Sequence, residues 1–511
     1  MKWISAFLAA AAFGAAPTVL VHAAPAVDEN TIVVAVEKSF QNLDAQVAAS
    51  GDSQRYAWQL YDTLYGFDAK GNLEPRAATS FKLSDDGLTY SYKLRAGMKF
   101  HDGEPVTAED VKYSFDRILD PVTKSTKRPY LARVESVRVA APDTIEVKLK
   151  DRDGAFHNKV ANNVFIIPKK YATSLPDADA FARAPIGSGP YKLKSHKIGQ
   201  ELELVRFDGY YGIKPAIERL VFKIIPEGST RANAIAKGEV DIVIQVPTNY
   251  RKQLEQNREL KVNSIPVASP MYVRLYTRDE ASPLSKRDVR MALNLALDRK
   301  AIVDSVFHGV GKPLGTFISE YFPYGSDPAI EPYPYDPQKA KALLASAGYP
   351  KGFKTKLYSP SDQAPELAAA IAAFWQQIGV QTEIARIDYA AWSRLNNTQQ
   401  SGPMTLSAFG NAIYDPINTV TGAFSKDGTW SSYYNPEVEA VIQEVIGTQG
   451  PEARGALFRK IGKMLYDDAA GVFINEIFYL YVQKSDLDWT ITEGSGFLDF
   501  RKVGWKTGKQ P

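Results

Sequence analysis

Histidine is the side chain that most often serves both as a general base and as a metal ligand, so its spacing bears on possible chemistry first. The chain has five histidines, and no two of them lie within four residues of each other: His22, His101, His157, His196 and His308. The paired histidines of a zinc-binding helix are therefore absent. The chain has no cysteine, which excludes disulfides, thiolate metal sites, a cysteine nucleophile and a lipid-modified N-terminal cysteine. These residues predict neither a metal site nor a cofactor.

Motifs for nucleophilic catalysis and phosphate binding are missing as well. Gly187-Ser188-Gly189 has the wrong spacing for a nucleophile elbow. Gly309-Val310-Gly311 and Gly494-Ser495-Gly496 lack the third glycine of a dinucleotide-binding fingerprint. The acidic pairs Asp85-Asp86 and Asp467-Asp468 fall in a turn and at a helix end, where such pairs are usually solvated. The sequence therefore gives no positive support for an enzymatic function, although a secreted hydrolase with two catalytic carboxyl groups stays open as an alternative.

The composition is that of a globular protein of about three domains. Of the 511 residues, 23% are charged and 45% are hydrophobic, and the formal net charge is +3. Charges of both signs are interspersed along the chain, which argues against binding to nucleic acid.

The N-terminal segment has the features of a secretory signal. Lys2 precedes an apolar run over residues 3–20, and Val21-His22-Ala23 fits a small-x-Ala cleavage site. We expect cleavage after Ala23, which removes residues 1–23 as a signal peptide, and an uncleaved membrane anchor is the alternative. Without a cysteine to carry lipid, the mature protein is expected to be soluble and periplasmic.

Strands and helices alternate along the rest of the chain, and they must position any binding site. The β-branched run over 31–36 predicts a strand buried on both faces. Thr107, followed three residues later by Asp110, predicts a capped helix start. Apolar alternation predicts strands, and cap residues predict helices, which together indicate an α/β or mixed α+β fold. The further predicted strands cover 89–94, 134–140, 144–149, 191–194, 201–206, 241–246 and 380–387, and the further helices begin near Ser53, Ser229, Ser285, Asp336, Pro365, Asn435 and Pro451.

Several stretches, in the same order, resemble family 5 of the bacterial extracellular solute-binding proteins. Members of this family are the peptide-, nickel- and oligosaccharide-binding components of ABC importers. The most specific stretches are Ala78–Gly103, which ends in Phe-His-Asp-Gly, and Pro283–Arg299, which ends in Ala-Leu-Asp-Arg. The similarity covers about residues 31–505 and includes shorter stretches at Leu43-Asp44, Pro185–Tyr191, Ala236–Asp241 and Tyr335–Tyr349.

The resemblance implies a periplasmic binding protein fold with two lobes, which close on a ligand by a hinge, and an extra domain inserted in the first lobe. It places lobe I at about 24–58, 186–262 and 484–511, the inserted domain at 59–185, and lobe II at 263–483. It also implies that the protein is not an enzyme and acts as a monomer. Its partners would be a small-molecule ligand, two permease subunits and, across the inner membrane, ATPase subunits.

Peptide-binding members of the family hold the ligand's ammonium group with an aspartate in the stretch Gly-Trp-Thr-Gly-Asp-x-x-Asp-Pro. The corresponding stretch is 408–416, where alignment on Asp415-Pro416 puts Phe409 at the tryptophan and Ala412 at the aspartate. A buried ammonium needs an ion partner, so we expect short zwitterionic peptides to bind poorly. In the family, the aspartate before this proline is usually structural.

The other candidates for ligand contact follow from their positions in the family pattern. Dipeptide-specific members bind the ligand carboxylate with an arginine that is missing from 357–363, and Arg274 or Arg386 could replace it. Phe409 is expected to offer a ring on which a ligand can lie, and Gly410 and Asn411 to offer hydrogen bonds. The remaining candidates are Lys38, Ser39, Phe40, Ala412 and Tyr414.

The sequence thus favours a binding protein that delivers a peptide, a peptide-like compound or another small polar ligand to a permease. Within the family, a glycoside, an opine-like compound, a metallophore or haem stays open as the ligand, although clustered histidines and cysteines for a metal are lacking. Outside the family, the alternatives are the secreted hydrolase of oligosaccharides or peptides and a periplasmic chaperone or adhesin.

Overall fold

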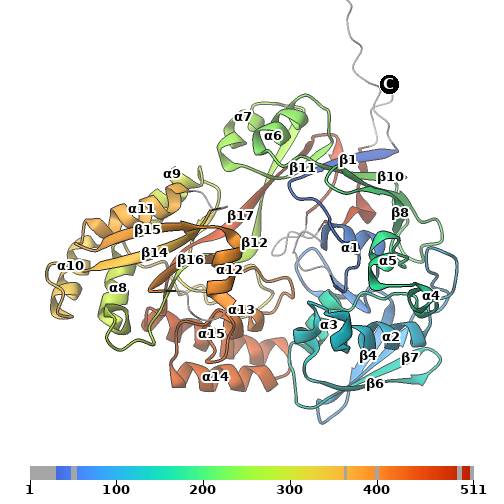
Figure 1. Ribbon diagram of the computed structural model, residues 1–511, viewed down its shortest axis with the longest axis horizontal. Coiled ribbons are helices and arrows are strands. Elements are labelled where there is room, and N and C mark those ends of the chain that lie inside the picture. The colour runs from blue at the N-terminus through green and yellow to red at the C-terminus, as the bar shows by residue number, and fades with distance from the viewer. Residues whose placement is uncertain (1–29, 48–53, 362–364, 398–401, 492–497, 507–511) are drawn as a thin grey trace, which may run out of the picture.

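Two long strands carry the chain between two bodies, and one sheet runs through both of them (Figure 1). The computed structural model describes residues 30–47, 54–361, 365–397, 402–491 and 498–506. The strand order is β15-β14-β16-β12-β17-β11-β1-β10-β9-β8, in which β12 (Leu260–Leu275) and β17 (Gly471–Lys484) cross between the bodies. These two strands pair antiparallel from one body to the other, with a register shift between Pro266 and Pro270.

Lobe I is the body around β1 (Thr31–Val36), which pairs parallel with both β10 (Arg219–Ile224) and β11 (Ile242–Val246). One face of β1 packs with α1 (Gln54–Leu60) and the other with α6 (Gly228–Ala236), so the strand is buried on both sides as predicted. Phe165, Ile167 and Phe181 also join this core, although they fall within 59–185, the range expected for the inserted domain. The other elements of lobe I are α4 (Lys169–Ser174), α5 (Ala178–Arg183), β8 (Tyr191–Lys197), β9 (Glu201–Arg206), α7 (Arg251–Glu255), β18 (Leu487–Asp488) and β19 (Gly504–Trp505).

The inserted domain has its own antiparallel sheet, in the order β4-β5-β7-β6, and its own core. Tyr90 and Tyr92 on β5 (Thr89–Leu94) both face that core, as their alternation predicts. Thr107 and Asp110 form a reciprocal capping box at the start of α2 (Ala108–Leu119). The remaining elements are β2 (Tyr65–Phe67), β3 (Leu73–Pro75), β4 (Ala78–Leu83), β6 (Val134–Ala141), β7 (Thr144–Leu149) and α3 (Phe156–Asn163).

Lobe II is the helix-rich body on the other side of the crossing strands, and its core surrounds both faces of its part of the sheet. Its strands besides β12 and β17 are β13 (Lys312–Pro313), β14 (Lys354–Pro360), β15 (Gln381–Ile387) and β16 (Met404–Ala408). Its helices are α8 (Arg287–Leu295), α9 (Arg299–Val306), α10 (Pro337–Ser346), α11 (Pro365–Gln376), α12 (Tyr389–Asn397), α13 (Ile417–Phe424), α14 (Pro436–Gly447) and α15 (Pro451–Asp467).

The predicted elements are all present, and each begins within two residues of its expected start. The mixed α/β class is confirmed, and the chain forms two lobes that the crossing strands β12 and β17 join. The expected signal peptide, residues 1–23, lies outside the described residues. Within the described part of the chain, no helix combines the length and the apolar character that a membrane crossing requires.

Candidate functional site

The strands of both lobes point their carboxyl ends toward each other. In lobe II, β16 pairs antiparallel with β12. The carboxyl end of β16, Ala408, lies opposite Met271, and its amino end, Met404, lies opposite Leu275. Because β12 runs from lobe I into lobe II, the carboxyl end of β16 is the end nearer to lobe I. β14 and β15 run in the same direction as β16. In lobe I, β11 and β1 run the opposite way, with Val246 nearer to lobe II than Ile242. Because ligands of open α/β sheets bind at the carboxyl ends of strands, the space between these two edges is the candidate site.

The loop 408–416 follows β16 at this edge, and a buried ion pair inside lobe II anchors it. Asp415 accepts hydrogen bonds from Arg454 Nη2 at 2.8 and 2.7 Å and from Tyr324 Oη at 2.5 Å. The side chains of Asp415 and Arg454 are 0% and 1% exposed. Asp415 is therefore committed to lobe II, in agreement with its expected structural role.

Asn411 is also used inside the loop, which corrects its expected place as a ligand contact. Its Nδ2 donates to Asp415 O and Thr419 Oγ1, each at 2.7 Å, and its Oδ1 accepts from Ile413 N at 3.1 Å. The side chain is buried. Because the amide forms these three hydrogen bonds within lobe II, it holds the turn of the loop rather than a solute.

The upper part of the loop is open at the cleft edge. Gly410 is exposed, Phe409 and Ala412 are half-buried, and no atom of the described residues lies within 4 Å of the position that a Cβ on Gly410 would take. The Phe409 ring packs edge-to-face against Trp430 at 4.9 Å between ring centroids. Ala412 offers only a methyl group, so the position that holds an aspartate in the peptide-binding pattern carries no charge here.

Arg274, which lies on β12 opposite Thr405 of β16, has unsatisfied donors. Its Nη1 donates to Trp430 O at 2.6 Å, but Nε and Nη2 have no hydrogen-bond partner among the described residues. The residue is 3% exposed, and burial lowers the pKa of its guanidinium to about 10. The hydroxyls of Tyr272 and Ser407, which lie directly opposite each other on β12 and β16, are also buried without a partner in the described structure. A buried cation in this state is a natural partner for an anionic group.

Arg386, the other predicted carboxylate partner, lies on the edge strand of lobe II. It is exposed, and its Nη2 donates to Ser361 O at 2.7 Å. β14 separates its strand from β16. The side chain thus holds the loop after β14 at the same edge of the sheet, apart from Arg274.

On the lobe I side, the three predicted residues after β1 separate into different environments. Lys38 is exposed at the carboxyl end of the strand. Ser39 Oγ accepts a hydrogen bond from Gly199 N at 2.8 Å, which ties the loop to the β8–β9 turn. Phe40 is 3% exposed and packs against Tyr56 and Phe222 in the lobe I core. Its expected place in the cleft is corrected, because the ring is enclosed by lobe I itself.

Tyr414 is corrected in a different way, because its ring leaves lobe II and enters the core of the inserted domain. It is fully buried, packs against Phe67 at 4.8 Å between centroids, and lies against Gly71. Its backbone has a left-handed φ of +50°, which is uncommon for an aromatic residue. Two hydrogen bonds reinforce this contact, from Asn158 Nδ2 to Ile413 O at 2.8 Å and from Gly154 N to Ile446 O at 2.9 Å.

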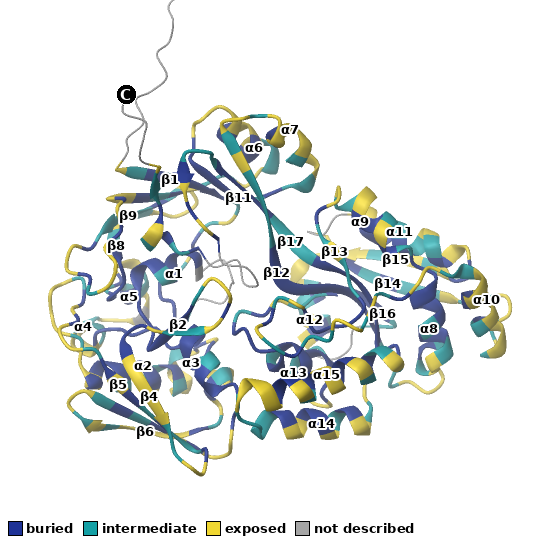
Figure 2. Ribbon diagram, turned by 180° about the vertical axis from the view of Figure 1, so that it is seen from behind, coloured by how far each residue is buried: buried dark blue, intermediate teal, exposed yellow. Residues whose placement is uncertain are grey.

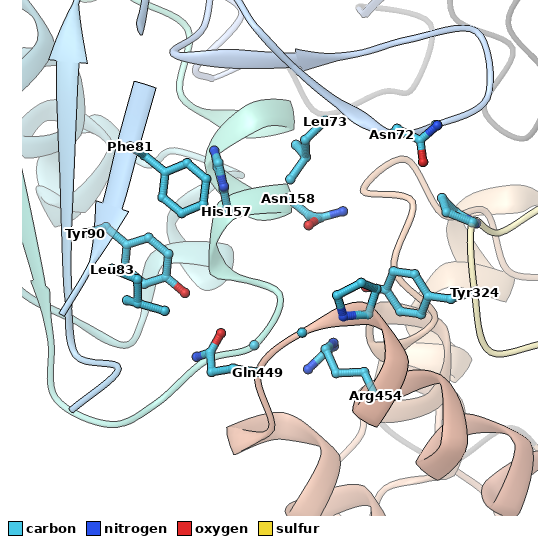
Figure 3. A pocket seen from close by; sticks show the side chains of 15 residues that line it. Asn72, Leu73, Phe81, Leu83, Tyr90, His157, Asn158, Tyr324, Gln449 and Arg454 are labelled. Carbon is cyan, nitrogen blue, oxygen red and sulfur yellow. The ribbon is translucent and has the colours of Figure 1, made fainter. Parts of the chain in front are cut away.

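A cavity of about 560 Å³ lies farther along this contact, between the inserted domain and lobe II (Figure 3). Figure 3 shows Phe81, Tyr90 and His157 on one wall and Tyr324 and Arg454 on the other. No group of three or more potential metal ligands occurs among the residues that the structure describes.

Sequence reasoning missed Arg454, Tyr324 and Trp430, which position the loop from elements distant in the chain. Only Asp415 carried a signal, because a structural aspartate inside a lobe requires a buried cation. The identity of that cation depended on how α15 packs.

The chain is similar to known binding proteins over most of its length. A family model described as "Bacterial extracellular solute-binding proteins, family 5 Middle" matches residues 72–431. Heme-binding protein A of Haemophilus influenzae is 29% identical over 86% of both chains. The glutathione-binding protein GsiB of Escherichia coli is 27% identical over 90% of this chain and 91% of that protein. The solved periplasmic binding protein DppA of Helicobacter pylori, in complex with the peptide STSA, is 25% identical, with a TM-score of 0.81 over 93% of this chain and 98% of that one.

Proposed function

The chain belongs to family 5 of the bacterial extracellular solute-binding proteins, whose members bind solutes for ABC importers, and from this premise we propose that its solute is an anion held by Arg274. The solute is a peptide-like or other small polar compound with a carboxylate and without a free ammonium group that must be buried. The protein captures it between the lobes, in the periplasm, and delivers it to a permease without catalysis.

The observation that carries the ligand class is the contrast between Arg274 and Ala412. Arg274 has two buried nitrogens without a hydrogen-bond partner among the described residues, and the hydroxyls of Tyr272 and Ser407 are in the same state. A carboxylate accepts from such groups with charge-assisted bonds, which are about twice as strong as neutral ones. The position where peptide-binding relatives place an acidic partner for an ammonium is a methyl group. The site therefore favours a negative end and offers no partner for a positive one.

Two aromatic rings and the open backbone complete the proposed site. Phe409 and Trp430 offer a face against which an apolar part of the solute packs, and Gly410 offers backbone hydrogen bonds at the exposed turn. From lobe I, Lys38 and Ser39 close over the solute, since they lie at the facing strand ends. Arg386 has a supporting role in this arrangement, because it holds the loop after β14.

Calorimetry with a matched pair of tripeptides tests the ligand class. N-acetyl-trialanine carries only the carboxylate, whereas trialanine carries both charges. We expect the acetylated compound to bind at least about tenfold more tightly, because it leaves no ammonium to be desolvated without a partner. Ala412→Asp should reverse this preference, and Ala412→Asn, of similar size and without charge, should not. Equal affinities for both compounds in all three proteins would contradict the assignment of Ala412 and Arg274.

A further inference from the structure

The cavity between the inserted domain and lobe II is separate from the proposed solute site. None of its lining residues lies in 408–412, on β12 or on β16. One wall comes from the β2–β3 turn, β4, β5 and α3 of the inserted domain, and the other from Pro323, Tyr324 and the start of α15 in lobe II. The cavity therefore exists only while these two parts of the molecule are in contact.

The lining is mainly aromatic and apolar, and its neutral polar side chains besides His157 are Asn72, Asn158 and Gln449. Phe81 on β4 is 40% exposed, an unusual state for a large ring that lies among others. It stacks with Tyr90 at 6.3 Å between centroids and an interplanar angle of 17°. Leu73, Leu83, Pro323 and Pro451 complete the apolar surface. Rings and aliphatic groups in this arrangement form an apolar surface against which a planar molecule can stack.

The lining of the cavity carries no unpaired charge. Arg454 is the one charged side chain among the lining residues, and Asp415 neutralises it through two hydrogen bonds to Nη2. His157 is buried beside Phe81, with ring centroids 4.0 Å apart, and burial lowers the pKa of its imidazole to about 3. A charged ligand would lose its hydration in this cavity without gaining an ion partner, so the free energy of desolvation would disfavour its binding.

Two polar atoms of the lining side chains are left without a hydrogen bond. His157 Nε2 and Gln449 Nε2 are both buried and have no hydrogen-bond partner among the described residues. A buried polar nitrogen without a partner is uncommon in folded proteins, and a ligand that supplies the missing hydrogen bond removes its cost.

We propose that this cavity is a second ligand site, for a planar, uncharged aromatic compound with one hydrogen-bonding group directed at His157. Its volume of about 560 Å³ lies within the usual range for small-molecule pockets. Because both walls must be present, occupancy favours contact between the inserted domain and lobe II. A ligand here and a solute in the cleft would therefore each raise the affinity for the other, as thermodynamic linkage requires.

Fluorescence titration of the mature protein with N-phenyl-1-naphthylamine tests the site, since this probe is flat, neutral and has a single N–H group. We expect saturable binding of one probe per chain. Leu83→Trp and Leu73→Trp fill the cavity from two different strands, and each should weaken binding at least tenfold. Ile198→Trp is the control, because Ile198 is 58% exposed on the surface of lobe I, and it should bind as the wild type does.

Binding that does not saturate, or that is equal in all four proteins, would overturn the proposal. Two cavity-filling variants are used because one of them could lose probe binding through misfolding alone. Thermal melting of each variant shows whether it is folded. The titration needs no cleft solute, so failure of the proposed function would leave its outcome unchanged. Conversely, a Leu83→Trp variant that loses the probe and keeps its cleft solute would separate the two sites.

Discussion

At the scale of single residues, the loop 408–416 depends on a cation that is far away in the sequence. Arg454 binds both carboxylate oxygens of Asp415, and Tyr324 donates to the same carboxylate. Burial and the neighbouring carboxylate raise the pKa of Tyr324, so its phenol stays protonated and remains a donor. This network fixes the lower half of the loop and leaves only its upper half, around Gly410, to meet a solute.

Asp415→Asn should destabilise the protein strongly. The substitution keeps the size of the side chain but leaves Arg454 charged and unpaired in a buried setting, which typically costs about 3–5 kcal/mol. Urea unfolding followed by circular dichroism measures the free energy of unfolding. Asp427→Asn, at an exposed position after α13, is the control and should change the stability by less than about 0.5 kcal/mol. A loss below about 1 kcal/mol for Asp415→Asn would show that the pair is not the anchor of the loop.

At the scale of elements, local sequence patterns predicted the helices and strands well but not how they meet. The capping box at Thr107 and the Asp336-Pro337 start of α10 depend on neighbouring residues alone, and both are present. The length of the crossing strands β12 and β17 did not emerge, because Pro266 and Pro270 interrupt the alternation and the pairing partners are about 200 residues apart. Candidate site residues were misplaced for the same reason. Whether Phe40 or Tyr414 faces a cleft or a core depends on distant packing.

The crossing strands contain a buried acid next to a shift in their pairing register. Glu476 on β17 lies opposite Pro270 on β12, next to the register shift, and Ala268 on the shifted segment has a left-handed φ of +44°. The carboxyl group is 2% exposed. Burial raises its pKa to about 7, although the Ser319 hydroxyl and the Ser269 backbone act to lower it. Lys312, its neighbour on β13, is bound to Glu320 at 2.6 Å.

This acid should make the stability fall as the pH rises from about 4.5 to about 7. In that window an unfolded glutamate is ionised while the folded one keeps its proton, so the folded state binds more protons and loses stability with increasing pH. Because a tenfold change in proton affinity is worth about 1.4 kcal/mol, the fall amounts to roughly 3 kcal/mol at most. Calorimetric melting at pH 5 and pH 8 should show this fall in the wild type and a smaller one in Glu476→Gln. Identical pH dependence in both proteins would rule out the effect, and Glu239→Gln, at an exposed site, is the control.

At the scale of the whole molecule, the lobes meet along the crossing strands and also away from them, through the inserted domain. The crossing strands form a continuous sheet whose pairing register shifts twice, between Pro266 and Pro270 and between Met271 and Tyr272, which suits them to act as a hinge. Figure 2 shows the inserted domain beside the part of lobe II that contains α13 and α14. The contacts between them include Tyr414, Asn158 and Gly154. A solute between the facing strand ends would hold the lobes together at the hinge side, and this second contact would close the opposite side.

Native mass spectrometry of protein purified without refolding tests the central claim most directly, because it detects a bound solute whatever its identity. We expect one small anionic molecule per chain in the wild type, and we expect Arg274→Met to lose it. Arg278→Met should retain it, since Arg278 also binds backbone oxygens of the 426–433 segment but is not proposed to meet the solute. Wild-type protein without any bound molecule, or an Arg274→Met variant that carries the same molecule at the same occupancy, would contradict capture of an anion by Arg274.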